Sequence, residues 1–135
     1  LHGTYYVTKQ ALPHLPDRTG RIINIASVLA LKGVADQPAY CAAKHAVLGF
    51  TRAMAHLAAP REITVNAICP GWTRTEMAEG RMKELNLPLE ELEAGVPIGR
   101  IIEPAEVAAL ALFLTSAAAG GITGQAFPID GGSLA

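Results

Sequence analysis

Three side chains in the first third of the chain could together move a proton to and from a carbonyl oxygen. Tyr40 lies 13 residues after Ser27, and Lys44 lies one helical turn beyond Tyr40. A free phenol has a pKa of about 10, too high for proton exchange at neutral pH, and a neighbouring ammonium favours the phenolate. A serine hydroxyl can hydrogen-bond a carbonyl oxygen as negative charge develops there. These residue types predict acid–base chemistry on a carbonyl or alcohol, with Tyr40 exchanging the proton.

The spacing of tyrosine and lysine is not specific by itself, because the chain contains it twice. Tyr5 and Lys9 are separated as Tyr40 and Lys44 are. No strand precedes Tyr5 in the chain, so no strand end can present a serine beside it. A solvent-exposed helix explains the Tyr5 pair, whereas the Tyr40 pair follows a predicted strand and has small alanines around it. We therefore assign the chemistry to Tyr40.

The elements that must position these side chains alternate between strand and helix patterns. Short β-branched runs predict buried parallel strands, and longer runs rich in alanine and leucine predict helices. Strands are expected at 21–27, 63–68 and 125–129, and helices at 3–15, 39–57 and 103–114. Between them, residues 73–93 are polar and partly helical, and Arg74 and Arg81 are expected to be solvated. This order predicts an α/β fold with three parallel strands, right-handed crossovers and flanking helices.

Ligands of such a sheet bind outside the carboxyl ends of its strands. Ser27 ends the first predicted strand, Pro70 and Gly71 follow the second, and residues 130–132 (Asp-Gly-Gly) follow the third. The loop between Ser27 and Tyr40 is long enough to fold the next helix back beside the strand end. The functional surface is therefore expected at this edge of the sheet.

The composition excludes several classes of function. Eleven basic and twelve acidic residues give a net charge of −1, which does not indicate a basic surface for binding nucleic acid or an anionic membrane. The four histidines lack metal-ligand spacing, and Cys41 and Cys69 are too few for a disulfide scaffold. The uncharged run at 107–129 is broken by polar residues and glycines, so no membrane span is expected. No signal peptide is visible, and we expect a cytoplasmic protein.

Four segments resemble the short-chain dehydrogenase/reductase family: NIAS at 24–27, PAYCAAKHAVLGFTRA at 38–53, ITVNAICPGWTRTEM at 63–77 and GQAFPIDGG at 124–132. They cover essentially the whole chain, in the family's order. The resemblance implies an NAD- or NADP-dependent oxidoreductase that interconverts a small-molecule alcohol and ketone. VPIGR at 96–100 resembles reductases of 3-oxoacyl thioesters, and ITVNAICPGW at 63–72 resembles 3-hydroxybutyrate dehydrogenases. A 3-oxoacyl or 3-hydroxyacyl substrate is the resulting expectation.

The resemblance also implies a role for each matching residue. Tyr40 would exchange the proton, Lys44 would assist it and hold the nicotinamide ribose, and Ser27 would polarise the substrate oxygen. The Pro-Gly pair is expected to line the cofactor site. After this pair, the Thr73 backbone would contact the nicotinamide carboxamide, and the Thr75 hydroxyl would contact the cofactor phosphates. The cofactor-binding set is then Tyr40, Lys44, Pro70, Gly71, Thr73 and Thr75.

The resemblance covers only the C-terminal half of the family's domain. The chain has no G-x-x-x-G-x-G turn for the cofactor pyrophosphate and no Asn-Asn-Ala-Gly strand. We expect residues 1–135 to form a single partial Rossmann-like domain, half of a doubly wound sheet, without the N-terminal cofactor-binding half. The alternative is a non-catalytic remnant or interaction module that keeps the oligomerisation helices.

The family pairs two helices across a two-fold axis, which implies a homodimer or homotetramer for the complete protein. In this chain the helices are expected at 3–15 and 39–57. Small alanines would allow close approach of the backbones, and larger apolar side chains would supply buried area. The residues expected there are Ala42, Ala43, Ala46, Val47, Phe50, Ala53, Met54 and Ala55.

Overall fold

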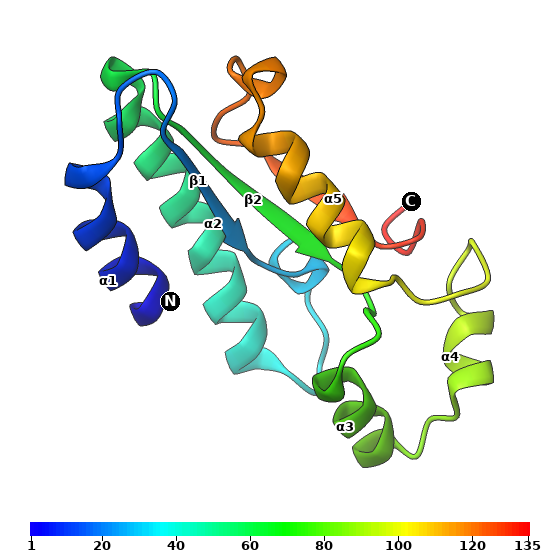
Figure 1. Cartoon of the computed structure of the whole chain (residues 1–135). Coiled ribbons are helices and arrows are strands. Elements are labelled where there is room, and N and C mark those ends of the chain that lie inside the picture. The colour runs from blue at the N-terminus through cyan, green and yellow to red at the C-terminus, as the bar shows by residue number, and fades with distance from the viewer.

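Three parallel strands form the central sheet in the computed structural model, which describes all 135 residues. Ala67 of the middle strand lies opposite Asn24 on one side and opposite Ala126 on the other. The strands lie in the order β1-β2-β3 (Figure 1), with bounds β1 (Arg21–Ile25), β2 (Thr64–Pro70) and β3 (Ala126–Ile129). The predicted α/β fold with three parallel strands is confirmed.

Five α-helices connect and cover the strands: α1 (His2–Ala11), α2 (Pro38–Ala58), α3 (Glu76–Leu85), α4 (Leu89–Ala94) and α5 (Pro104–Thr115). Short 3₁₀ helices lie at 12–14 (η1), 28–30 (η2), 59–61 (η3) and 117–119 (η4). Figure 1 shows α1 beside α2, and it shows α3 and α4 beyond the end toward which the β2 arrow points. The polar segment at 73–93 thus lies at the carboxyl end of the sheet.

Alternation of side chains along β2 places α2 and α5 on opposite faces of the sheet. Ala67 and Cys69 point to one face, where they pack with Leu48 of α2. Ile68 points to the other face and packs with Leu114 of α5. All of these side chains are buried. Both faces of β2 are therefore covered, which explains why consecutive residues of the strand are buried, the polar Thr64 and Asn66 included, rather than every second one.

The ends of the predicted elements shift for local reasons. The first helix stops at Ala11 instead of reaching Leu15, because Pro13 lies in η1, where the helix tightens. The first strand stops at Ile25, because Ser27 already caps η2. The second strand continues to Pro70, since the N–H of the next residue supplies the bond to β3.

Two residues expected at a subunit interface face the sheet instead. Val47 is 4% exposed and Ala55 is 5% exposed, and each lies in a core cluster with residues of β2. The helical period of α2 places both on its apolar stripe. The expectation for these two residues is wrong. Phe50 lies outside these clusters and packs edge-on against Tyr5 of α1, with the ring centroids 6.1 Å apart.

The first strand pairs on one side only. β1 pairs with β2, and its other edge borders a groove of about 370 Å³ lined by α1 and β1. Ile25 at the end of the strand is 52% exposed, and Val7 of α1 is 69% exposed. Unpaired strand edges of this kind are ready to pair with further polypeptide.

Three further features bear on function. No helix combines the length and the apolar character needed to cross a bilayer. No cluster of three His, Cys, Asp or Glu side chains forms a possible metal site. Both cysteines are free thiols in the folded chain.

Candidate active site

Ser27 stands where β1 ends and the chain turns into η2. Its backbone is extended, and its Oγ accepts a hydrogen bond of 3.1 Å from the Leu29 backbone N–H. This contact makes Ser27 the N-cap of η2 and fixes the side chain. The hydroxyl has no acceptor within the chain for its own proton, so that proton is available to a ligand.

Lys44 joins the start of α2 to the end of β1. Its Nζ donates a hydrogen bond of 3.1 Å to the Ile25 carbonyl oxygen, and it lies 5.5 Å from the centroid of the Tyr40 ring. Tyr40 itself is 37% exposed. One ammonium group therefore contacts the strand that presents Ser27 and the ring of Tyr40.

The second Tyr–Lys pair shows what distinguishes the first. Lys9 lies 5.9 Å from the centroid of the Tyr5 ring, so the two pairs have similar internal geometry. Lys9, however, makes no hydrogen bond to a strand end, whereas Lys44 does. The tie to β1, rather than the spacing, sets Tyr40 and Lys44 apart.

Burial changes the electrostatics around Lys44. Partial burial lowers the pKa of the Lys44 ammonium from its usual value, and the nearby Cys69 thiolate would oppose that shift. Burial likewise raises the pKa of the Cys69 thiol, against a hydrogen bond from the Ser27 backbone and the charge of Lys44. Cys69 is fully buried and lies just before Pro70. Cys69 packs in the core with Ala67 and Leu48, as a small residue at a strand end is expected to, and this position also places its thiol close to Lys44.

Pro70 and Gly71 bring β2 against β3 at the same edge. The Gly71 N–H donates to the Ile129 carbonyl at 3.0 Å. A Cβ at Gly71 would lie 2.9 Å from the Cα of Asp130, so a side chain there would force the two segments apart. Glycine is needed here for close approach rather than for an unusual backbone angle.

Thr73 and Thr75 lead from this edge into α3. The Thr73 hydroxyl donates to the Gly71 carbonyl at 3.1 Å, and the Thr75 hydroxyl caps α3 by accepting from the Ala78 N–H at 3.3 Å. The Thr73 backbone N–H has no acceptor within the chain. A free N–H and a capped helix N-terminus are therefore both present at the carboxyl edge of the sheet.

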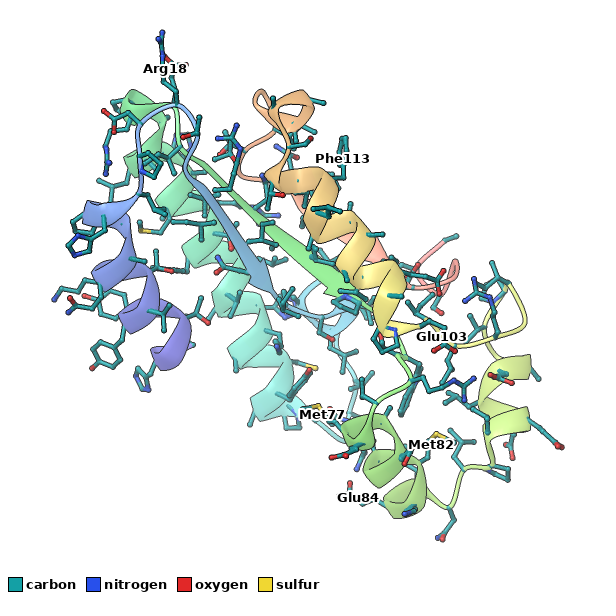
Figure 2. All side chains as sticks on the ribbon, in the orientation of Figure 1. Arg18, Met77, Met82, Glu84, Glu103 and Phe113 are labelled. Atoms are coloured by element: carbon teal, nitrogen blue, oxygen red, sulfur yellow. The ribbon has the colours of Figure 1, made fainter.

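The charged residues beyond this point are paired rather than simply solvated. Arg74 contacts Glu103 at 2.8 Å and Glu93 at 3.3 Å, and Figure 2 shows Glu103 at the start of α5. Arg81 forms ion pairs with Asp36 and Glu84, and only 26% of its side chain is exposed. The expectation of a solvated side chain is therefore wrong for Arg81, whereas Arg74 remains exposed, with 43% of its side chain accessible. Asp36, Glu93 and Glu103 lie too far away in sequence for spacing to indicate them, whereas Glu84 lies three residues after Arg81 on the same helix.

The structure places the seven predicted site residues at one edge of the sheet. They come from the end of β1, the start of α2, and the end of β2 with the loop that follows it: Ser27, Tyr40, Lys44, Pro70, Gly71, Thr73 and Thr75. This edge is the carboxyl end of the parallel strands, where ligands of open α/β sheets bind.

Comparison with known proteins identifies relatives of the whole chain. A family profile described as enoyl-(acyl carrier protein) reductase matches residues 1–133. D-beta-hydroxybutyrate dehydrogenase of Cupriavidus necator is 38% identical, over 100% of this chain and 56% of that protein. Acetoacetyl-CoA reductase of Shinella zoogloeoides is 43% identical, over 99% of this chain and 55% of that protein.

Solved structures agree with the sequence comparison. Actinorhodin polyketide ketoreductase with NADPH superimposes with a TM-score of 0.91 and 38% identity, over 98% of this chain and 55% of that one. ElxO with NADP superimposes with a TM-score of 0.82 and 30% identity, over 98% and 54%. The chain thus spans about half the length of the relatives it matches. By fold, by edge residues and by these matches, the chain belongs to the short-chain dehydrogenase/reductase family.

Proposed function

We propose that this chain is the C-terminal, catalytic part of a nicotinamide-dependent oxidoreductase that interconverts an alcohol and a ketone. The observation that carries the proposal is the contact of Lys44 with both the Ile25 carbonyl and the Tyr40 ring. It links an acid–base group to the strand end that presents Ser27. The Tyr5 pair lacks that link, although its internal geometry is similar.

Ser27 is proposed to bind the substrate oxygen. Its Oγ already accepts a hydrogen bond from the Leu29 N–H, and its own proton has no acceptor in the chain. A fixed hydroxyl donor stabilises negative charge that develops on a carbonyl oxygen without reorganising during the reaction. Ser27 would therefore both orient the substrate and polarise its carbonyl.

Tyr40 is proposed to exchange the proton at that same oxygen. In reduction, the carbonyl carbon gains a hydride while the phenolic O–H of Tyr40 gives its proton to the oxygen, so a ketone becomes an alcohol. In oxidation, the phenolate takes the proton back. The Lys44 ammonium lies within cation–π distance of the ring and stabilises negative charge on it. General acid–base catalysis of this kind contributes about 10²- to 10⁴-fold.

The edge also fits the nicotinamide half of NAD or NADP. The free Thr73 N–H can donate to the carboxamide, and the Lys44 ammonium can donate to ribose oxygens. The Thr75 hydroxyl at the start of α3 can meet a phosphate by turning its proton away from the Thr73 carbonyl, to which it donates at 3.3 Å. Pro70 and Gly71, at the end of β2, would line the site beside these donors. When bound, the cofactor supplies or accepts the hydride.

The relatives favour a 3-oxoacyl or 3-hydroxyacyl substrate. Two of them are named as a hydroxybutyrate dehydrogenase and an acetoacetyl-CoA reductase, and a third as a 3-oxoacyl-[acyl-carrier-protein] reductase. Each name describes a three-carbon unit with oxygen at C1 and C3. We extend that substrate class to this protein. A cytoplasmic location accords with two free, buried cysteines.

We further propose a homodimer or homotetramer built through α1 and α2. These helices lie beside each other, and several of their residues are uncovered: Tyr6 is 60% exposed and Leu57 is 64% exposed. Phe50 and Tyr5 form an aromatic contact between the two helices. Apolar surface of this extent favours a symmetric contact with a second copy.

A second candidate function is a non-catalytic interaction module. The open edge of β1 and the half-length match favour it. Cofactor binding separates the two functions, because an interaction module has no need for it.

The test is a chimera in which the N-terminal half of the Shinella acetoacetyl-CoA reductase precedes Leu1. We expect the folded chimera to bind NADH or NADPH and to reduce acetoacetyl-CoA. A chimera that folds and binds either cofactor, yet reduces neither acetoacetyl-CoA nor acetoacetate, would contradict the proposed substrate class. A folded chimera that binds no cofactor would favour the interaction module.

A further inference from the structure

α3 differs from the other four α-helices because none of its residues is buried. Figure 2 shows Met77 and Met82 on this helix, and Met77 is 77% exposed. Burial of apolar surface, which holds α2 and α5 to the sheet, therefore contributes little to the position of α3.

The segment that carries α3 is fixed at both of its ends. At its start, the Arg74 N–H donates to the Ile102 carbonyl at 2.9 Å, and the Ile102 N–H donates to the Trp72 carbonyl at 2.8 Å. At its end, the Ile98 N–H donates to the Gly131 carbonyl at 3.2 Å. A Cβ at Gly131 would lie 2.8 Å from the Ile98 side chain, so glycine at this position leaves room for Ile98 to pack there. α3 is thus a weakly packed helix between two anchored ends.

A single ion pair ties the middle of α3 to the rest of the molecule. Arg81 binds the Asp36 carboxylate through one Nη atom and the Glu84 carboxylate through the other, at 2.7 Å for Glu84. Glu84 belongs to α3 itself, whereas Asp36 lies in the loop between Ser27 and Tyr40. No other hydrogen bond or ion pair joins a side chain of α3 to a residue outside 75–87.

We propose that the Asp36–Arg81 ion pair is a latch that holds α3 against the loop between the proposed catalytic residues Ser27 and Tyr40, and that its release opens the site to substrate. The link to substrate entry rests on the proposed function; the link between the ion pair and the position of α3 does not. Arg81 and Asp36 act here as positioning residues, because neither is proposed to touch the reacting atoms.

The expected size of the effect follows from exposure. Half of the Asp36 side chain is accessible to solvent, at 52%. Ion pairs of this kind shift an equilibrium by about two- to five-fold, and salt weakens them. A two- to five-fold change is enough to affect the position of α3, because no buried side chain of this helix also holds it in place.

The test is amide hydrogen exchange on the 135-residue chain, measured over α3. In low salt, Asp36→Asn should speed exchange of the α3 amides about two- to five-fold. In about 1 M salt, where the Debye length is about 3 Å, the parent chain should approach the variant. In an Arg81→Gln background, Asp36→Asn should add nothing, because the pair is already broken.

The matched control is Glu62→Gln, which removes the exposed Arg18–Glu62 pair. Figure 2 shows Arg18 at the end of the molecule far from α3, so this variant should leave α3 exchange unchanged. Equal α3 exchange in the parent and Asp36→Asn, or an equal effect of Asp36→Asn in both backgrounds, overturns the latch.

Substrate entry is tested separately in the active chimera. There, Asp36→Asn should raise KM for acetoacetyl-CoA about two- to five-fold, because α3 without its latch no longer closes over bound substrate, with kcat changed by less than about two-fold. An unchanged KM, with or without a fall in kcat, overturns the entry role. Because hydrogen exchange needs no turnover, an inactive chimera would count against the proposed function and leave the latch intact.

Discussion

At the scale of single residues, a link to a strand end distinguishes two Tyr–Lys pairs that are alike in sequence spacing. Both lysines lie within 6 Å of a tyrosine ring, at 5.5 Å for Tyr40 and 5.9 Å for Tyr5. Only Lys44 donates to a carbonyl at the end of β1. The same link explains the low pKa of Lys44, because reaching the strand end partly buries its ammonium group.

The burial of Lys44 predicts a pH dependence of stability. Its pKa in the folded state is lower than the unfolded value of about 10.5. Below the folded pKa the ammonium is charged in both states and disfavours folding, and this penalty disappears as the pH rises toward about 10.5. Lys44→Met removes the penalty. The free energy of unfolding of Lys44→Met relative to the parent should therefore fall between neutral pH and pH 10.

Urea unfolding of both proteins across this pH range measures the difference. The control is Lys9→Met. Its free energy of unfolding relative to the parent should not show this fall, because Lys9 is exposed and makes no hydrogen bond to a strand end. A Lys44→Met difference that is constant from neutral pH to pH 10 would show that the Lys44 ammonium is not destabilised in the folded chain.

At the scale of secondary structure, the sequence predicted each strand and long helix but not their ends. Strands such as Ile63 to Ile68 are recognisable because the run is short and rich in β-branched and apolar residues, and the structure buries all six, including the polar Thr64 and Asn66. The ends depend on contacts that span the fold, such as the Gly71 bond to Ile129. The same limit applies to the site: Ser27, Tyr40 and Lys44 follow from type and spacing, whereas the Asp36–Arg81 pair and the place of Cys69 depend on tertiary structure.

The start of α5 provides a test at this scale. There the Glu106 carboxylate binds Arg100 at 2.7 Å and accepts from the Glu103 N–H at 2.8 Å. The Arg100 guanidinium and this N–H lower the pKa of Glu106 to about 2. A folded pKa below the unfolded value stabilises the fold above about pH 4.5, and the contribution is lost as the pH falls toward 2.

We therefore expect Glu106→Gln to lower the free energy of unfolding at pH 7 and to have a smaller effect at pH 3. Urea unfolding at the two pH values measures both differences. Glu62→Gln, which breaks an exposed ion pair elsewhere, should have little effect at either pH. An equal loss for Glu106→Gln at pH 7 and pH 3 would mean that its charge does not stabilise α5.

At the scale of the whole molecule, the chain has the features of half of a larger sheet. One edge of β1 is unpaired, apolar residues of α1 and α2 are exposed, and the relatives are almost twice as long. The edge proposed to hold the nicotinamide is present, whereas the chain has no glycine-rich turn for the pyrophosphate. Because orientation of the reactants supplies much of an enzyme's rate, the 135-residue chain alone should be a poor enzyme.

This expectation is measured by comparing the isolated chain with the chimera in acetoacetyl-CoA reduction. The chain should bind NADPH weakly and turn over at least about 100-fold more slowly. Turnover by the isolated chain at the rate of the chimera would mean that the chain is complete for catalysis.

Assembly is the second property that belongs to the whole molecule. Phe50→Arg in the chimera should give smaller particles in light scattering and lower activity, because the charge would be buried between copies of α2. Met77→Arg is the control, since Met77 lies on α3, and it should keep the parent's mass. A Phe50→Arg protein with the parent's mass and rate would exclude this interface.

The most direct test of the central claim compares Tyr40→Phe with Tyr5→Phe in the chimera. Each variant removes one phenolic hydroxyl and keeps the ring, and each ring has a lysine at a similar distance. We predict that Tyr40→Phe lowers kcat for acetoacetyl-CoA at least about 100-fold with cofactor affinity nearly unchanged, whereas Tyr5→Phe changes kcat by less than about two-fold. Similar losses in the two variants would contradict the assignment of Tyr40 as the proton-exchanging group.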